Sequence, residues 1–212
     1  MWGNKMKIES IRISNDGYVN CMSRFYSAHD ILDSGSFYSF SPGINKLIGE
    51  IDSGNWAVSY LLSMYKHRPQ DFILFEQPNV FVNNELISLT DLSEFSCYMD
   101  ESYPLFSDSV PIKEHIIRGL NHSKLNLSYD DIMNLFDVDS DESFRFERPL
   151  KSVGNTIIRA MAAIGVSYNK ELFCFPWLSD SRFKYYNGNM TMTLQLLEKI
   201  GKTVIVPVGS PS

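Results

Sequence analysis

The sequence predicts an α/β fold built around a buried parallel sheet. Two segments, Leu172–Phe175 and Thr203–Val208, are largely apolar over a short length, which is typical of strands covered on both faces. A helical pattern precedes each of them: Ile157, Met161 and Ile164 share one helix face, and a last helix is expected at about 191–200, ending at Gly201. Helices that alternate with buried strands indicate a parallel sheet.

The first half of the chain has mainly strand-like periodicity. We expect strands at 6–13, 36–40, 44–48, 71–77 and 80–89, with a turn at Asn83 and Asn84. From Ala57 the period becomes helical, because Val58, Leu61, Leu62 and Tyr65 fall on one face. Residues 104–142 are then expected to be helical, with Ser128 as an N-cap.

Composition restricts the class of protein. The 212 residues are 44% hydrophobic and 21% charged, which fits a globular protein with a substantial core. No stretch is apolar enough to span a bilayer, and the N-terminal residues lack the apolar core of a secretion signal. Cys21, Cys97 and Cys174 are far apart, which favours reduced, inert thiols in a cytoplasmic protein over a disulfide frame or zinc site.

The net charge of −6 is unevenly distributed along the chain. Residues 71–148 contain five basic and sixteen acidic side chains, whereas both flanking segments are slightly basic. This acidic middle segment is either a solvated surface or a docking surface for a basic partner. Nucleic acid is disfavoured as a partner, because its phosphates would be repelled along the whole segment.

The stretch LIGEIDSGNWAVSYLL (47–62) has the outline of a phosphate-binding loop. Gly49 and Gly54 have the spacing of the two glycines in G-x-x-x-x-G-K-[ST], between a predicted strand and a predicted helix. Asn55 occupies the lysine position and Trp56 the hydroxyl position. Two glycines alone are a weak signal, so their meaning depends on the rest of the chain.

Later segments follow this loop in the order that one family has them. YMDESYPLF (98–106), LKSVGNTIIRAMAAIGVSYNKELFCFPWLSD (150–180) and GKTVIVPVGS (201–210) resemble the Q-loop, the signature-to-Walker-B region and the switch strand of ATP-binding cassette (ABC) ATPases. The resemblance is collinear over residues 7–210. It implies a P-loop NTPase-like ABC ATPase fold with a mostly parallel core sheet, an N-terminal antiparallel β subdomain and an inserted helical subdomain.

The same resemblance implies one ABC ATPase-like domain over residues 1–212. Within it, 1–100 would be the β-rich part with the degenerate phosphate loop, about 101–150 the helical subdomain, and 151–212 the C-terminal part of the α/β core.

The departures from the family pattern predict the loss of ATP hydrolysis. Asn55 brings no charge to a phosphate, and the indole of Trp56 cannot bind magnesium. Glu50 and Asp52 add repulsion, which for one pair of like charges about 4 Å apart costs about 4 kcal/mol at an effective dielectric of about 20. The resemblance places the remaining lost groups of the Q-loop, Walker B and switch at Glu101, Pro176, Trp177 and Gly209. We therefore expect a vestigial nucleotide site (Gly49, Ser53, Gly54, Asn55, Trp56), no catalytic residue and no bound metal.

The signature segment is better preserved than the loop. Ser152 and Gly154 match the serine and second glycine of the family signature, and a helix is expected to begin near Asn155. In this family two domains pair head to tail, and the signature of one closes over ATP held by the other. The resemblance thus implies a non-hydrolysing subunit that pairs with a competent ABC ATPase, as a hetero- or homodimer.

The resemblance also implies how the chain would reach ATP and where it would act, and two other functions remain open. ATP and magnesium would be reached only through the partner, and the complex could lie beneath a membrane permease at the inner face of the membrane. A stand-alone binding or regulatory module that keeps the fold without nucleotide is the main alternative, and an enzyme with new chemistry around Glu101 or Asp52 is a third. Trp56 is either a stacking platform for a ring or a packed side chain. Pro176 and Trp177 either line a small-molecule pocket at the carboxyl ends of the strands or form a rigid strand exit with a core tryptophan.

Overall fold

The computed structural model describes residues 7–14, 19–23, 26–32, 35, 37–50, 53–68, 70, 72–106 and 109–209. Its centre is a parallel sheet in the order β5-β11-β10-β9, formed by Gly43–Ile48, Thr203–Val208, Leu172–Cys174 and Ser96–Tyr98. All three pairings are parallel. The side chains of β10 and β9 are buried, as are all but the last of β11, because apolar strands covered on both faces leave no side for water. The predicted parallel sheet is confirmed.

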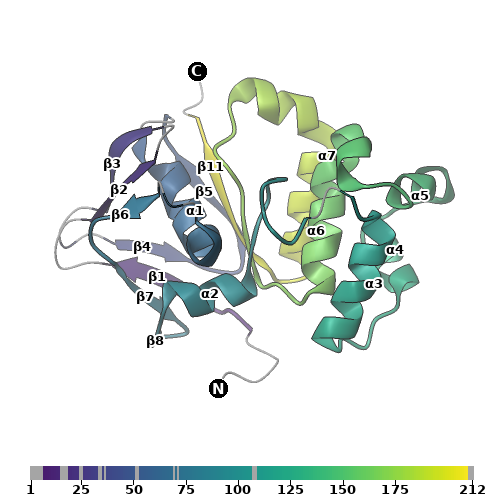
Figure 1. The fold of residues 1–212 in the computed structure, drawn as a ribbon, viewed down its shortest axis with the longest axis horizontal. Helices are drawn as coiled ribbons and strands as arrows, with labels where there is room; N and C mark the ends of the chain where they lie inside the picture. Colours follow the sequence, from purple (N-terminus) through teal and green to yellow (C-terminus); the bar gives the residue numbers. More distant parts are fainter. Residues whose placement is uncertain are drawn as a thin grey trace.

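Helices cover both faces of this sheet. Helix α1 (Asn55–Met64) lies on one side of β5 and β11, and α6 (Ile157–Ser167) and α7 (Asp180–Lys199) lie on the other (Figure 1). Nine of the ten α1 residues are buried, so this helix is core on almost every face. Phe173 and Phe175, which are fully buried, belong to the same continuous core.

Two antiparallel sheets come from the first half of the chain. One has the order β4-β1-β7-β8, formed by Phe37–Phe40, Ile11–Ser14, Asn79–Val82 and Glu85–Ile87. The other has the order β3-β2-β6, formed by Tyr26–Leu32, Val19–Ser23 and Ile73–Leu74. Asn83 and Asn84 join β7 to β8 with φ of 52° and 66°, which confirms the predicted turn.

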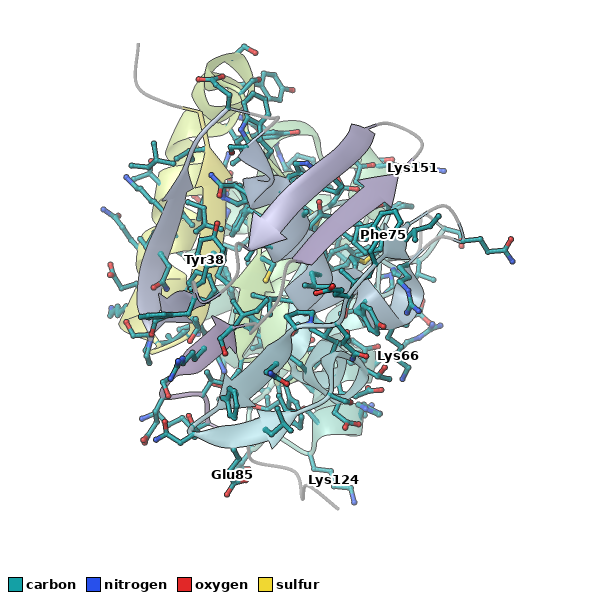
Figure 2. All side chains as sticks on the ribbon, turned by 90° about the vertical axis from the view of Figure 1, so that its left-hand side faces the viewer. Tyr38, Lys66, Phe75, Glu85, Lys124 and Lys151 are labelled. Carbon is teal, nitrogen blue, oxygen red and sulfur yellow. The ribbon has the colours of Figure 1, made fainter. Side chains whose placement is uncertain are left out.

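Three short helices form a separate group beyond α6 in Figure 1: α3 (Ile112–Ser123), α4 (Tyr129–Leu135) and α5 (Ser140–Phe146). Ser128 caps α4 in a capping box with Asp131, as its position in the sequence predicts. Lys124, which ends α3, and Glu85, in the β7–β8 hairpin, both point outward from the body of the protein (Figure 2).

Several predicted boundaries were wrong. The first strand begins at Ile11, not at residue 6, and α1 begins at Asn55, two residues before the periodic apolar pattern, before continuing as the 3-10 turn η2 (Tyr65–His67). Helix α2 (Leu89–Phe95) was missed, because Ser88 caps it and ends the strand that precedes it. Helix α7 begins at Asp180, eleven residues before the predicted start, since its packing outweighs the poor helix propensity of Asn187-Gly188-Asn189.

Candidate functional site

The described residues between β5 and α1 keep the strand–loop–helix order of a phosphate loop and hydrogen-bond to one another. Gly49 ends the strand and donates its N–H to the carbonyl of Val208, 2.9 Å away. Ser53 donates both its N–H and its hydroxyl to the carbonyl of Glu50, at 2.9 and 2.6 Å. Gly54 then adopts a left-handed conformation with φ of 81° and caps α1. The N–H of Ser53 is therefore engaged inside the loop.

Asn55 lies inside this loop, against Gly49. Its side chain is 7% exposed, and a Cβ added to Gly49 would come within 2.7 Å of the amide nitrogen Nδ2 of Asn55. The same Cβ would come within 2.4 Å of the hydroxyl oxygen of Ser53. Two short polar side chains thus approach the backbone of Gly49, which leaves room for glycine alone at that position. Asp52 lies outside the described residues.

Trp177 crosses from the end of β10 to this loop. Its indole N–H donates to the carbonyl of Gly49 over 3.1 Å. Gly209, at the end of β11, lies beside the same ring, since a Cβ there would be 3.7 Å from the Cζ2 atom of Trp177. Ser59 of α1 donates its hydroxyl to the carbonyl of Phe175 at 2.5 Å, which fixes the chain just before Pro176 and Trp177. Residues predicted as Walker B and switch positions therefore meet the loop.

Trp56 is a packed side chain, which is one of the two interpretations that the sequence left open. It is 7% exposed, and its ring lies 6.3 Å from that of Tyr60 and 6.4 Å from that of Phe72, both in edge-on geometry. Tyr60 extends the cluster to Tyr98, 5.4 Å away. Such edge-to-face contacts stabilise a core beyond the area they bury. The family resemblance also implies a base-stacking aromatic residue at Phe25 or Tyr26. Phe25 and the side chain of Tyr26 lie outside the described part of the structure.

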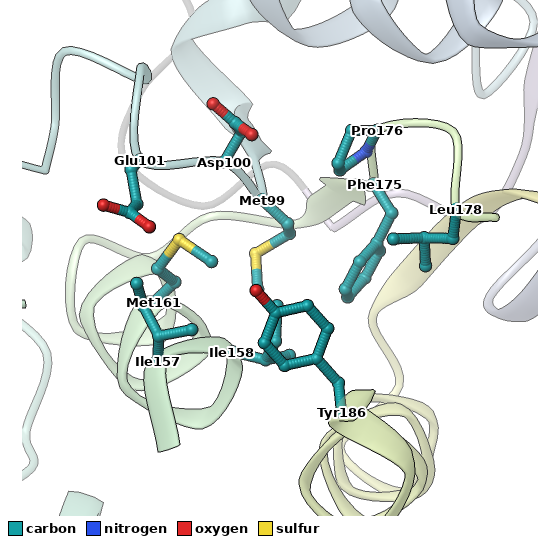
Figure 3. A pocket seen from close by; sticks show the side chains of 10 residues that line it. All are labelled: Met99, Asp100, Glu101, Ile157, Ile158, Met161, Phe175, Pro176, Leu178 and Tyr186. Atoms are coloured by element: carbon teal, nitrogen blue, oxygen red, sulfur yellow. The ribbon is translucent and has the colours of Figure 1, made fainter. Parts of the chain in front are cut away.

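Glu101 and Pro176 line a small pocket of about 40 Å³, apart from the loop (Figure 3). Asp100 and Glu101 come from the loop after β9, apolar side chains of α6 form one wall, and Tyr186 of α7 reaches in from the other side. A volume of this size suits one or two waters and no organic substrate. Among the described residues no group of three His, Cys, Asp or Glu side chains could hold a metal ion.

From the sequence, the pair Tyr185-Tyr186 is expected either to contact a partner or to lie in a loop with packed aromatic rings. In the structure both residues lie in α7. Their rings meet edge-on with centroids 4.9 Å apart.

The signature-like segment lies at a third place. It folds as two 3-10 turns, η3 (Leu150–Ser152) and η4 (Gly154–Thr156), which lead into α6 close to the predicted helix start. Ser152, Gly154 and Asn155 are exposed, and Gly154 has φ of 58°. Ser152, Val153 and Gly154 line a surface pocket of about 300 Å³. The other side of this pocket consists of α5 residues and the turn after it, namely Phe144, Arg145 and Arg148.

Sequence reasoning missed Phe144, Arg145 and Arg148. The available signal was charge: RFER (145–148) places two arginines at the end of the most acidic part of the chain. A basic pair in an acidic segment stands out only once its position relative to Ser152 is known.

The two buried thiols in the core are expected to stay protonated and unreactive. Cys97 and Cys174 are fully buried, and burial raises the pKa of each to about 12. A thiol that stays protonated is neither a nucleophile nor a metal ligand. This agrees with the predicted inert role of Cys174.

Comparison with known proteins identifies the fold. No protein-family model and no curated protein sequence matches the chain. Among solved structures, the chain is similar to a Pyrococcus furiosus protein named as a candidate ABC transporter ATP-binding protein, with a TM-score of 0.63 and 13% identity. The superposition covers 96% of this chain and 93% of that one. The fold is that of an ABC ATPase.

Within the ABC ATPase fold, the predicted positions separate into three groups. Gly49, Ser53, Gly54 and Asn55 are together, and Trp177 and Gly209 join them. Glu101 and Pro176 line the small pocket, while Trp56 turns into the aromatic cluster. Ser152 and Gly154 line a pocket that shares no residue with the other two groups. None of the described helices is long and apolar enough to cross a membrane.

Proposed function

We propose that this chain is a non-hydrolysing ABC-type subunit that offers its signature segment to the ATP site of a competent partner ATPase. It binds neither ATP nor magnesium in its own loop, and the partner supplies both. The complex would act in the cytoplasm or beneath a permease at the inner face of the membrane. The observation that carries this proposal is a contrast between two segments. The side chains of Ser53 and Asn55 occupy the space beside Gly49, whereas the signature segment at Ser152 is exposed.

The contacts in the loop support the loss of phosphate binding. A phosphate loop holds its ligand with free backbone N–H groups, a lysine and a metal-binding hydroxyl. Here the N–H of Ser53 is bonded to Glu50, Asn55 lies against Gly49, and Trp56 is committed to a core cluster. These side chains do not fit a triphosphate with magnesium.

The positions of the former catalytic groups support the loss of hydrolysis. A general base or magnesium ligand needs a carboxylate at the end of β10. That end instead carries Pro176 and Trp177, and the indole N–H of Trp177 donates to the carbonyl of Gly49. Gly209 has no side chain with which to polarise water.

The signature segment supports a role in trans. Ser152 presents a hydroxyl and Gly154 opens the turn before α6, so donors lie at a helix start on the surface. A subunit can therefore complete a partner's site without binding ATP in its own loop.

The test is reconstitution with the ABC ATPase encoded beside this chain's gene. We expect a complex whose ATP turnover exceeds that of the partner alone, and a loss of that gain with Ser152→Ala. Ser102→Ala, an exposed serine in another loop, is the matched control. No complex, or no effect of Ser152→Ala, would reject the proposal.

Calorimetry of the isolated chain with ATP and magnesium tests the loss of nucleotide binding in the loop, and the absence of any complex with an ABC partner would favour the remaining alternative. A stand-alone module that keeps the fold without nucleotide predicts a stable chain with neither nucleotide affinity nor an ABC partner. Nucleotide binding that depends on magnesium and is lost when Asn55 is changed would show that the loop still works.

A further inference from the structure

We propose that the pocket between α5 and the signature segment binds an oligophosphate anion directly on this chain, through Arg145 and Arg148. The ligand class is an inorganic or nucleotide-borne di- or triphosphate. The inference adds two binding residues outside the signature, and it concerns the isolated chain, so it does not require a partner ATPase.

The pocket gathers positive charge at one place. Arg145 and Arg148 line it on one side, and Ser152 and Gly154 line it on the other. Guanidinium groups bind phosphate oxygens in a two-pronged geometry, and two of them match the charge of a polyanion better than that of a single carboxylate. Among the described residues that line the pocket there is no carboxylate.

The two arginines are not neutralised by their neighbours. Glu142 pairs with Arg159, a buried arginine of α6, and Glu147 pairs with Lys113 at 2.7 Å. Neither Arg145 nor Arg148 forms an ion pair with any side chain that the structure describes. Glu142 and Glu147, the described acidic side chains nearest to these arginines along the chain, are thus paired with other cations.

The arginines are held in place before any ligand binds. Both guanidinium groups lie over the ring of Phe144, at 5.1 Å for Arg148 and 5.9 Å for Arg145. Arg145 also donates to the hydroxyl of Thr156, which is buried at the start of α6, over 3.1 Å. Ordering a flexible side chain in advance reduces the entropy lost on binding.

The opposite wall supplies a neutral donor. Ser152 is exposed and presents a hydroxyl, and Gly154 borders open space, since an added Cβ would have no neighbour within 4 Å. The backbone N–H groups of Ser152 and Val153 are bonded to the carbonyls of Pro149 and Leu150, so the hydroxyl of Ser152 provides the donor at this wall. A volume of about 300 Å³ is at the lower end of small-ligand sites and accommodates a chain of phosphates.

The experiment is a titration of the isolated full chain with inorganic tripolyphosphate in the absence of magnesium, followed by calorimetry or ³¹P NMR. Arg148→Gln is the test variant, because Arg148 is exposed and the hydrogen bonds it makes with Ile112 and Arg145 use its backbone, which the change leaves in place. Arg118→Gln is the matched control: it removes the same charge from an exposed helix position paired with Glu114. We expect saturable binding, weakened about tenfold or more by Arg148→Gln and less than about twofold by the control.

Three results would overturn the proposal. These are no binding at millimolar tripolyphosphate, equal weakening by both variants, and equal affinity for citrate, which would indicate a carboxylate site. ATP without magnesium, tested in parallel, distinguishes nucleotide-borne phosphate from free oligophosphate. Reconstitution with a partner measures turnover, so the two proposals can fail separately. Tripolyphosphate binding without an effect on a partner would reject the proposed function and support this site. An effect on a partner without tripolyphosphate binding would support the proposed function and reject this site.

Discussion

The indole N–H of Trp177 donates to the carbonyl oxygen of Gly49 across 3.1 Å, although 128 positions separate the two residues. This bond joins the end of β10 to the loop after β5, two strands that do not touch each other in the sheet because β11 lies between them. In a hydrolytic ABC ATPase these two places carry the base and the phosphate loop. Here they are tied to each other.

Replacing Trp177 with phenylalanine keeps a ring and removes the donor. We expect Trp177→Phe to lower the free energy of unfolding by about 1 kcal/mol, the usual net contribution of one hydrogen bond. Urea unfolding measures it. Tyr185→Phe, which removes a polar atom from a side chain that is 65% exposed, should change stability by less than about 0.5 kcal/mol. Equal effects would mean that the Trp177–Gly49 bond has no net stabilising role.

Gly49 should not tolerate a side chain. A methyl group there would come within 2.4 Å of the hydroxyl oxygen of Ser53, so Gly49→Ala should lower the free energy of unfolding by about 1–3 kcal/mol through overpacking. Gly188→Ala is the control, because its Cβ would meet nothing within 4 Å and α7 is helical there. That change should stabilise the protein by about 0.5–1 kcal/mol. Thermal unfolding distinguishes the two, and an unaffected Gly49→Ala protein would contradict the loop geometry.

The buried ion pair between Arg159 and Glu142 should matter more than surface pairs. Arg159 is 4% exposed, and it also donates to the carbonyl of Asp137 at 3.3 Å. Glu142→Gln leaves this cation without its carboxylate and should cost about 2–4 kcal/mol. Glu114→Gln, in an exposed pair with Arg118, should cost under about 1 kcal/mol. A chemical denaturation series of both variants checks the ranking, which an equal loss would refute.

The core thiols should resist modification. Since Cys97 and Cys174 are fully buried and the pKa of each is raised to about 12 by burial, an aromatic disulfide reagent at about pH 8 should label at most one of the three cysteines in the folded chain. All three should react in denaturant. Rapid labelling of two or more thiols without denaturant would show that the core sheet opens.

The same burial predicts alkaline sensitivity. The pKa of Cys97 and of Cys174 rises from 9.0 to about 12, and burial raises the pKa of Tyr129 from 10.0 to about 12. The unfolded chain therefore loses protons that the folded chain keeps, so stability is full below pH 9 and falls as pH rises toward 12. Stability measured by urea across this range should fall less steeply in the Cys97→Ala, Cys174→Ala double variant. An unchanged slope would assign the effect to other groups.

Local periodicity in the sequence was sufficient to predict the core elements. The apolar runs at Leu172–Cys174 and Thr203–Val208, the turn at Asn83 and Asn84 and the cap at Ser128 all lie where the sequence predicted them. The order of its motifs also predicted the ABC ATPase fold, which a structural neighbour at only 13% identity confirms. The strands, the turn and the cap each depend on residues that are near one another in the chain, whereas the fold prediction used the order of motifs along the whole chain.

Boundaries set by long-range packing were predicted less well. Helix α7 extends eleven residues further toward the N-terminus than its apolar pattern, and α2 replaces the end of a predicted strand. For α7, contacts with the rest of the protein outweigh weak local preference. For α2, the local signal was the N-cap at Ser88, which was read as part of a strand.

The sequence by itself determined which chemical groups occupy each motif: Asn55 for lysine, Trp56 for a hydroxyl, Pro176 and Trp177 for two carboxylates. Only the tertiary structure decided what those groups contact. It turned Asn55 onto Gly49, Trp56 into an aromatic cluster and Trp177 across to the loop, and it placed Arg148 opposite Ser152. The chemical nature of each side chain is given by the sequence, whereas contacts between residues that are distant in the sequence form only when the sheet and its helices pack.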